Sequence, residues 1–188
     1  MQQWIINEDE KQPLDLVIAN AGISGGTGGS GEGEEQARRI FDVNVAGVLN
    51  TVSPVLPRMI ARCTGQIAIM SSLASFSGWP GAPAYSASKG AVRMYGEALR
   101  GAVAPYGVKV NVICPGFIET PMTAVNDYDM PFMMSAEKAA YYTARGIERN
   151  QARIAYPFRT YFFAGLIGVM PAGLSSLILR KMPKKPAQ

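Results

Sequence analysis

The chain has 188 residues, of which 48% are hydrophobic and 17% are charged, and its formal net charge is +4. A chain of this length can bury the core of one domain, and no basic stripe interleaved with aromatic residues indicates a nucleic-acid partner. The sequence contains no histidine, which removes the usual zinc ligand and the usual general base. We therefore expect no metal site, and acid–base chemistry carried by Tyr, Lys or carboxylates.

The first segments predict a helix followed by a buried strand. Residues 1–11 are polar with a small apolar patch and resemble the end of a helix. Residues 14–19, LDLVIA, are an almost uninterrupted apolar run of the kind that lies inside a parallel sheet. No basic and apolar leader precedes them, so we expect no signal peptide.

A literal G-x-G-x-x-G follows this strand and is formed by Gly26, Gly28 and Gly31. The pattern is typical of dinucleotide-binding loops, but the glycines do not follow the strand directly, and three glutamates lie within residues 32–35, where the next helix begins. Carboxylates in a first helical turn interact with the partial positive charge that would otherwise bind phosphate. The acidic ribose ligand expected about 20 residues further on is also missing. We therefore reject a phosphate site and expect residues 22–33 to form a flexible surface loop.

Residues 34–62 predict a long helix with an apolar face, and Pro54 and Pro57 are expected to kink its second half. Asn44 lies within this helix. Taken alone, an asparagine in the middle of a helix is usually a surface residue or a polar group whose hydrogen bonds are satisfied.

The middle of the chain places two hydroxyl groups and a lysine near one another. Residues 66–70 are a β-branched apolar run that stops at two serines, which predicts a buried strand with Ser72 just past its end. A loop rich in Gly, Pro and Ser follows, and a helix is predicted from Pro83 onward. Tyr85 and Lys89 are four residues apart and share one face of that helix. A neighbouring ammonium favours the phenolate, so this pair can bring a tyrosine with an ordinary pKa of about 10 toward proton transfer at neutral pH.

The remaining segments complete the predicted sheet. Residues 108–114, VKVNVIC, predict a strand, and Pro115-Gly116 after it is first of all a turn signal. A helix is predicted over residues 135–151 with Ser135 as its N-cap, and a short strand over residues 153–156.

Around the tyrosine the chain closely resembles the short-chain dehydrogenase/reductase family. Alone, Tyr-x-x-x-Lys also fits a half-exposed tyrosine beside a solvated lysine. In that family, however, a serine precedes the tyrosine by thirteen residues and a YxASK segment carries the lysine, and the spacing from Ser72 to Tyr85 and the segment YSASK match both.

Three further motifs occur in the family's order. Asn20-Ala21-Gly22 corresponds to the family's NNAG segment, with Ala19 in place of the first asparagine. Asn44 lies in the motif NVxG, twenty-eight residues before Ser72, and Pro115-Gly116 matches the family's PG motif. The resemblance covers about residues 14–123.

The resemblance implies an α/β fold with a doubly wound parallel sheet of the Rossmann type, and hydride transfer between NAD or NADP and a carbonyl or alcohol. It implies that Tyr85 donates or accepts the proton and that Ser72 binds the substrate oxygen. Lys89 would lower the tyrosine pKa and bind the nicotinamide ribose, and Asn44 would hold a water that relays protons to the lysine. The implied cofactor-binding residues are Asn20, Ala21, Gly22, Tyr85, Lys89, Pro115, Gly116, Ile118 and Thr120.

Only the C-terminal half of the family's sheet is recognisable. The family's first βαβαβ half, with its TGxxxGxG turn, needs roughly 60 residues or more, whereas thirteen residues precede the first predicted strand. We therefore expect a truncated Rossmann-type domain over residues 1–156, which is either a fragment of a longer protein or a chain whose sheet a partner completes. The alternative is a non-catalytic, membrane-associated remnant that serves as an interaction module.

The last segment is apolar with basic ends. Residues 160–179 carry no charge, and the flanking basic residues are Arg159, Arg180, Lys181, Lys184 and Lys185. Twenty apolar residues can span a bilayer, but two short helices with Pro171 as an N1 residue fit as well. Three interpretations stay open: a membrane-surface hairpin or interfacial helix, a lid or oligomer contact packed on the domain, and a true span. We treat residues 157–188 as a helical extension.

Cysteine usage indicates the compartment. Cys63 and Cys114 have no metal spacing, so we expect buried free thiols in a reducing environment. We expect a cytoplasmic protein with peripheral membrane contact through residues 160–179, which forms a homo-oligomer and acts on a small, lipophilic carbonyl or alcohol.

Overall fold

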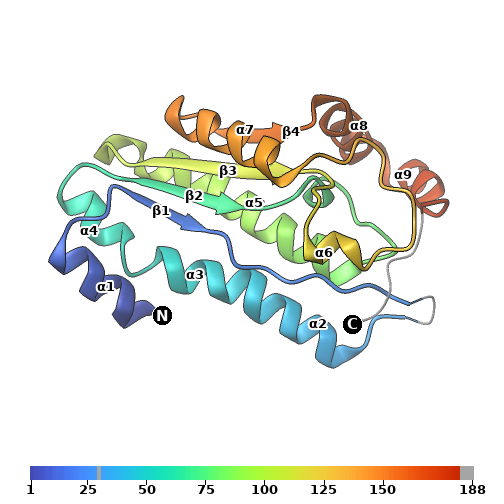
Figure 1. Ribbon diagram of the computed structural model, residues 1–188, viewed down its shortest axis with the longest axis horizontal. Coiled ribbons are helices and arrows are strands. Elements are labelled where there is room, and N and C mark those ends of the chain that lie inside the picture. Colours follow the sequence, from blue (N-terminus) through green and yellow to red (C-terminus); the bar gives the residue numbers. More distant parts are fainter. Residues whose placement is uncertain (29–30, 183–188) are drawn as a thin grey trace.

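The computed structural model describes residues 1–28 and 31–182. A parallel sheet of four strands in the order β1-β2-β3-β4 lies at its centre, with helices on both faces (Figure 1). The strands are β1 (Leu16–Ala19), β2 (Gln66–Met70), β3 (Lys109–Pro115) and β4 (Arg153–Tyr156). β1, β2 and β4 lie within segments that the sequence predicts as strands, and β3 extends one residue past its predicted end, to Pro115, which pairs with Tyr156. The predicted α/β fold class is confirmed.

Nine helices are labelled in Figure 1 for the described residues. They are α1 (Gln2–Lys11), α2 (Glu34–Phe41), α3 (Gly47–Val52), α4 (Leu56–Ala61), α5 (Pro83–Val103), α6 (Pro121–Ala124), α7 (Ala136–Glu148), α8 (Phe158–Val169) and α9 (Ala172–Leu179). Three short turns of helix connect them: the π-helical turn η1 (Asp42–Ala46) and the 3-10 turns η2 (Leu73–Ser75) and η3 (Ala104–Tyr106).

One face of the sheet is covered by α3, α4 and α5. Ile67 and Ile69 of β2 are completely buried in the core between these helices and the sheet. Gly96 allows α5 to lie directly on the strands, because a Cβ atom there would be 2.6 Å from Val112 Cγ2. The helix with the predicted tyrosine and lysine is therefore held against β2 and β3.

The other face is covered over β3 and β4 by α7, while α8 packs beside β4 and η2 (Figure 1). Side chains of successive strand residues point to opposite faces, so Ile113 faces α7 and Val112 faces the α5 side. Leu16 and Ile18 of β1 remain 40% and 45% exposed. In the described chain, this end of the sheet is open to solvent on one face.

A buried carboxylate holds α1. The side chain of Asp9 is 1% exposed and accepts hydrogen bonds from Arg62 Nη1 at 2.8 Å and from Leu14 N at 2.9 Å, and it also pairs with Arg58. Burial raises the pKa of Asp9, but the hydrogen bonds from Arg58, Leu14 and Arg62 together outweigh burial, so the net shift is downward. The ion pairs, with the buried Ile5, fix α1 against α4.

The long helix predicted over residues 34–62 is present but interrupted. It contains the π-helical turn around Asn44 and a break between α3 and α4, where Pro54 lies. Proline lacks the N–H that an α-helix needs and clashes with the preceding turn, which accounts for the break. The helix predicted over residues 135–151 ends earlier, at Glu148, and Ser135 caps it as expected by accepting from Lys138 N at 3.3 Å.

The expectation of two buried thiols is correct for Cys114 and wrong for Cys63, which is exposed. Cys63 lies in the tight turn between α4 and β2 and has a φ angle of 54°. A turn of this kind holds the chain at the surface, and composition alone does not reveal it.

The apolar segment 160–179 forms two helices. α8 ends at Val169 and α9 begins at Ala172, with Pro171 as the N-cap of α9 rather than its N1 residue. α8 has 12 residues and α9 has 8, whereas a straight span needs about 20. The interpretation as one straight span is therefore wrong, and Lys184 and Lys185 lie outside the described residues.

A different helical run, Glu34–Ala61, is long and apolar enough to cross a bilayer by length and composition. In the fold it packs against β1 and α5 as part of the core.

Candidate active site

The residues that the sequence singles out meet at one edge of the sheet. The segments that follow β1 and β2 carry Asn20, Ala21, Gly22 and Ser72, and the carboxyl end of β3 carries Pro115, its last residue, followed by Gly116. Carboxyl ends of parallel strands share one edge, and α/β proteins bind their ligands there. The first turns of α5 bring Tyr85 and Lys89 to the same edge.

Asn44 connects the segment after β1 to α5 through side-chain hydrogen bonds. It is completely buried in η1, where Gly47 N donates to Asp42 O, one residue further than in an α-helix. Its Oδ1 accepts from Ile23 N at 2.8 Å, and its Nδ2 donates to Ile23 O at 2.9 Å and to Ser88 Oγ at 3.0 Å. Asn44 is thus a buried polar group with satisfied hydrogen bonds, and it lies at the edge that the motifs share.

Gly22 brings the main chain close to the lysine. A Cβ atom at this position would lie 3.1 Å from Lys89 Nζ and 3.3 Å from Asn44 Oδ1. Lys89 is 4% exposed, and its Nζ donates to Met70 O at 3.0 Å. Burial lowers the pKa of Lys89 from 10.5 to about 8, and the interaction with Cys114 acts weakly in the opposite direction. The lysine can therefore gain or lose a proton close to neutral pH.

Tyr85 and Ser72 form a hydroxyl pair. The Ser72 hydroxyl accepts from Ala74 N at 3.1 Å and lies 3.5 Å from Pro115 O, so it lies between the ends of β2 and β3. Burial raises the pKa of Tyr85, and its hydrogen bond with Ser72 lowers it by less. Lys89 does not contribute to this shift: its Nζ donates to Met70 O and lies 6.0 Å from the centroid of the Tyr85 ring.

The burial of Lys89 makes stability depend on pH. Between the folded pKa of about 8 and the unfolded value of 10.5, the unfolded chain binds more protons than the folded chain, so stability rises with pH. Cys114 has the opposite effect from pH 9 upward, because burial raises its pKa from 9.0 to about 11. We expect the free energy of unfolding to rise by about 1 kcal/mol from pH 8 to pH 9 in urea titrations, and not to rise in Lys89→Met. An equal rise in the variant would contradict this origin.

The segment after β3 is held by its own hydrogen bonds. Gly116 N donates to Tyr156 O at 2.8 Å. Thr120 is the N-cap of α6 and forms a capping box with Thr123, whose hydroxyl also donates to Ile118 O. The Thr120 hydroxyl, which the resemblance assigns to the nicotinamide, is therefore engaged in a cap.

The glycine-rich loop packs against α5. Glu32 Oε2 accepts from Ala84 N at 2.8 Å and satisfies a free N–H in the first turn of the helix that carries the tyrosine. Gln36 Nε2 donates to Gly26 O at 3.1 Å, and residues 24–26 are buried. The expectation of a flexible surface loop is wrong for this part, and residues 29–30 lie outside the described chain. The sequence does not reveal this cap, because 52 residues separate Glu32 from Ala84.

An aromatic cluster beside Tyr85 was not predicted from the sequence. The ring centroids of Trp79 and Tyr128 are 6.0 Å apart and those of Phe117 and Tyr128 are 6.5 Å apart, both edge to face. The Tyr128 hydroxyl is buried and has no hydrogen-bond partner among the described residues. Burial, and then the neighbouring Asp127 and Tyr85, raise the pKa of Tyr128 to about 12. The three rings come from separate loops, so no spacing in the sequence marks them.

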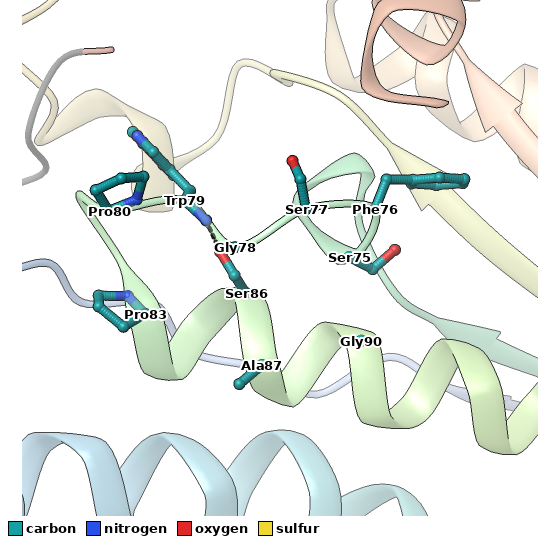
Figure 2. Close-up of a pocket in the computed structure, with 10 residues that line it drawn as sticks. All are labelled: Ser75, Phe76, Ser77, Gly78, Trp79, Pro80, Pro83, Ser86, Ala87 and Gly90. Atoms are coloured by element: carbon teal, nitrogen blue, oxygen red, sulfur yellow. Dashed lines mark hydrogen bonds between the residues drawn. The ribbon is translucent and has the colours of Figure 1, made fainter. Parts of the chain in front are cut away.

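A cavity of about 470 Å³ adjoins this cluster (Figure 2). It lies between the loop after η2 and the first turns of α5, and Phe76 and Trp79 line it. Trp79 N donates to Ser86 Oγ at 3.2 Å across its floor. Neither Tyr85 nor Lys89 is part of its lining, so the cavity is a neighbour of the hydroxyl pair and not the place of the chemistry.

Comparison with known proteins agrees with this geometry. The family model of the short chain dehydrogenases matches residues 5–130. An uncharacterized oxidoreductase of Myxococcus xanthus is 38% identical over 169 residues, which are 90% of this chain and 67% of that protein. The 2-(R)-hydroxypropyl-CoM dehydrogenase of Xanthobacter autotrophicus is 39% identical over 116 residues, 58% of this chain and 45% of that protein. A cyclopentanol dehydrogenase of Comamonas sp. is 40% identical over 114 residues, 61% of this chain and 46% of that protein.

Solved structures show the same fold. A short chain dehydrogenase from Burkholderia cenocepacia J2315 in complex with NADP superposes with a TM-score of 0.78 at 23% identity, over 97% of this chain and 77% of that one. One from Sphingobium yanoikuyae in complex with NADPH superposes with a TM-score of 0.76 at 19% identity, over 100% of this chain and 73% of that one. The chain thus spans about two thirds of the Myxococcus relative and somewhat less than half of each of the two dehydrogenases.

Proposed function

Because this chain belongs to the short-chain dehydrogenase family, we propose that it is part of an NAD(P)-dependent oxidoreductase that interconverts a carbonyl and an alcohol. The proposal rests on one observation, the convergence of Asn44, Ser72, Tyr85 and Lys89 on the sheet edge beside Gly22. A protein without this chemistry has no physical need for a buried lysine and a hydroxyl pair at the ligand-binding edge.

The residues at this edge fit a nicotinamide cofactor. Gly22 lets a ligand approach the main chain beside Lys89 and Asn44, since any side chain there would fill the space. The proposed cofactor-binding set is Asn20, Ala21, Gly22, Tyr85, Lys89, Pro115, Gly116, Ile118 and Thr120. When bound, the cofactor supplies or accepts the hydride.

The chain's own residues move the proton. Tyr85 donates a proton to the carbonyl oxygen during reduction and accepts one from the alcohol during oxidation. Ser72, hydrogen-bonded to Tyr85, holds the same substrate oxygen. Lys89 titrates close to neutral pH and can replace the proton, and Asn44 Oδ1 keeps one lone pair for a relay water.

The experiment that tests this function uses the protein from its native source. We expect oxidation of NADPH or NADH in the presence of a ketone, and a polypeptide mass above 20.2 kDa if the chain is a fragment. Light scattering on the same sample tests the expected homo-oligomer. Absence of turnover together with absence of cofactor binding would support the alternative, a non-catalytic interaction module.

The substrate is proposed to be lipophilic. Trp79, Phe117 and Tyr128 present an apolar surface beside the hydroxyl pair, and cyclopentanol, named for one relative, is a compact apolar alcohol. We expect kcat/KM to be at least about tenfold higher for cyclopentanone than for the polar ketone dihydroxyacetone. The reverse order would contradict a lipophilic substrate.

We also propose peripheral contact with an anionic membrane through α8 and α9. Phe158 and Phe163 are 74% and 57% exposed, and the exposed Arg159, Arg180 and Lys181 complement anionic lipid head groups. We expect the native protein to co-sediment with phosphatidylglycerol vesicles, and a smaller fraction of the Phe163→Ser variant to do so. Tyr141→Ser on α7 is the matched control, because Tyr141 is 61% exposed on another helix. Failure of the native protein to sediment would exclude this contact.

A further inference from the structure

A second cavity, of about 530 Å³, lies between α5, the η2 turn and α8, and neither Ser72 nor Tyr85 is part of its lining. The lining residues that matter here are Phe76, Arg93, Arg153, Phe162, Leu166 and Val169. Gly168 lets α8 approach the turn, because a Cβ atom there would be 2.5 Å from Phe76 O. Three elements that pack closely together thus form the walls of this cavity.

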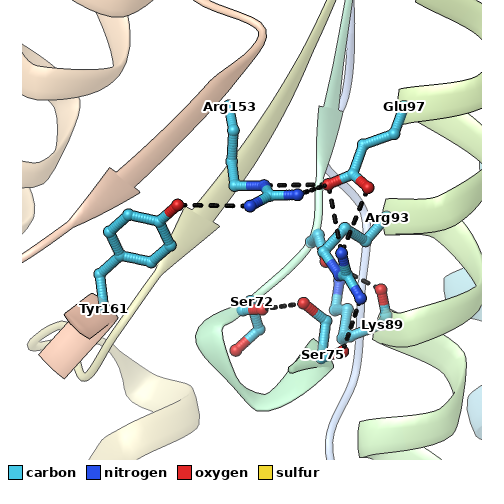
Figure 3. Close-up of polar contacts among 8 residues, drawn as sticks. Ser72, Ser75, Lys89, Arg93, Glu97, Arg153 and Tyr161 are labelled. Carbon is cyan, nitrogen blue, oxygen red and sulfur yellow. Dashed lines mark hydrogen bonds and ion pairs between the residues drawn. The ribbon is translucent and has the colours of Figure 1, made fainter. Parts of the chain in front are cut away.

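Its polar side carries one excess positive charge. In the described part of the chain, the carboxylate of Glu97 pairs with both guanidinium groups: its Oε2 is 3.2 Å from Arg93 Nη1, and its Oε1 accepts from Arg153 Nε at 2.9 Å (Figure 3). The exposed fractions of the Arg93, Glu97 and Arg153 side chains are 19%, 32% and 32%. A half-buried cation without its own counter-charge is costly, so an anion is favoured beside this cluster.

The two guanidinium groups are held in place but keep donors available. Their Cζ atoms lie 4.7 Å (Arg93) and 5.1 Å (Arg153) from the centroid of the Phe76 ring, which fixes the direction of their N–H groups. The remaining bonds are long: Arg93 Nη2 is 3.4 Å from Ser75 O, and Arg153 Nη1 is 3.3 Å from Tyr161 Oη. Bonds of this length are weak, so a carboxylate can replace them without large loss.

The wall opposite the arginines is apolar. Phe162, Leu166 and Val169 of α8 line the cavity and are 56%, 43% and 81% exposed. An aliphatic chain lying on them would remove this surface from water. The arginines therefore match an anionic head group, and α8 matches an apolar tail.

We propose that this cavity binds an anionic amphiphile, a carboxylate or phosphate head group on a long aliphatic tail. The head group contacts Arg93 and Arg153, and the tail lies along α8. The site is independent of hydride transfer. Its head-group chemistry is shared by free fatty acids and by anionic lipids, and the experiment separates these two sources.

Calorimetric titration of the purified protein with dodecanoate tests the site. We expect a dissociation constant below about 100 μM for dodecanoate. The dissociation constants of hexanoate and of the uncharged dodecanol should each be at least about tenfold higher. Arg93→Gln is expected to weaken dodecanoate at least about tenfold. Leu166→Ser changes the surface that contacts the tail and leaves the arginines unchanged. We expect it to lower the affinity for dodecanoate about fivefold. Arg149→Gln is the matched control, because this exposed arginine at the end of α7 is not in the lining, and the affinity of this variant for dodecanoate should not change.

The outcomes are distinct. Equal affinity for dodecanol and dodecanoate, or unchanged affinity in both Arg93→Gln and Leu166→Ser, would overturn the proposal. Phosphatidylglycerol vesicles that bind the native protein but not Arg93→Gln, without affinity for free dodecanoate, would assign the head group to a bilayer lipid. Vesicle binding that is indifferent to Arg93→Gln, with no dodecanoate affinity, would also overturn the site. Tyr85→Phe should bind dodecanoate normally, so failure of the proposed enzymatic function leaves this test intact.

Discussion

Replacing Tyr85 by phenylalanine is expected to lower kcat by at least about 10³-fold while the fold stays intact, because the change removes the proton donor and nothing else. Tyr85 is half-buried as a residue and its hydroxyl is hydrogen-bonded to Ser72, and we expect the ring to stay in place in the variant. The measurement is NAD(P)H oxidation with a ketone substrate, together with circular dichroism of the variant.

Tyr106→Phe is the matched control for this substitution. Tyr106 lies in η3 at the opposite end of α5 and is 49% exposed, so loss of its hydroxyl should leave turnover unchanged. A Tyr85→Phe variant with a rate near that of the native enzyme would rule out the proposed proton donor. Equal losses in both variants would indicate damage to α5 rather than lost chemistry.

The largest loss of stability is expected at Asp9. Replacing Asp9 by alanine removes a carboxylate that is 1% exposed and leaves Arg58 and Arg62 without their common partner. Breaking a buried ion pair costs about 3–5 kcal/mol, and since the two arginines are 35% and 22% exposed, we expect about 3 kcal/mol. The measurement is urea unfolding at pH 7.

Glu10→Ala provides the control, because Glu10 is 59% exposed and lies 3.5 Å from the same Arg58. Its loss should change stability by less than about 0.5 kcal/mol. The pKa of Asp9 is lowered by folding, so its contribution is present above pH 3.8 and is lost as the pH falls through the folded value. The difference in free energy of unfolding between the native protein and Asp9→Ala should therefore disappear in acid. A difference that persists there would indicate that the variant has lost packing contacts.

The sequence predicts those parts of the fold whose causes are local. The β-branched run of β2 and the capping serine at residue 135 act within a few neighbours, and both elements form where expected. The candidate site could be found because Ser72, Tyr85 and Lys89 lie on consecutive elements, so their spacing along the chain is also a spacing in space.

Contacts between distant segments could not be predicted. The ion pair of Glu97 with Arg153 joins residues 56 apart, and the Glu32 cap on α5 joins residues 52 apart. The pKa of Tyr85 also depends on such contacts, because the spacing to Lys89 reveals the neighbouring charge but not the burial that opposes it. The exposure of Cys63 goes with the tight turn between α4 and β2, in which this residue has a φ angle of 54°.

Because only one of the two thiols is exposed, Cys63 can be labelled selectively with a fluorophore. Cys114 is buried and its pKa is raised to about 11, so it stays protonated and should not react with maleimide at pH 7. Cys63 precedes the amino end of β2, whereas Ser72 follows its carboxyl end. Five strand residues at about 3.3 Å each separate the two ends by roughly 17 Å. A fluorophore on Cys63 would thus report on ligand binding by energy transfer between the fluorophore and the bound ligand, without contacting the reacting groups.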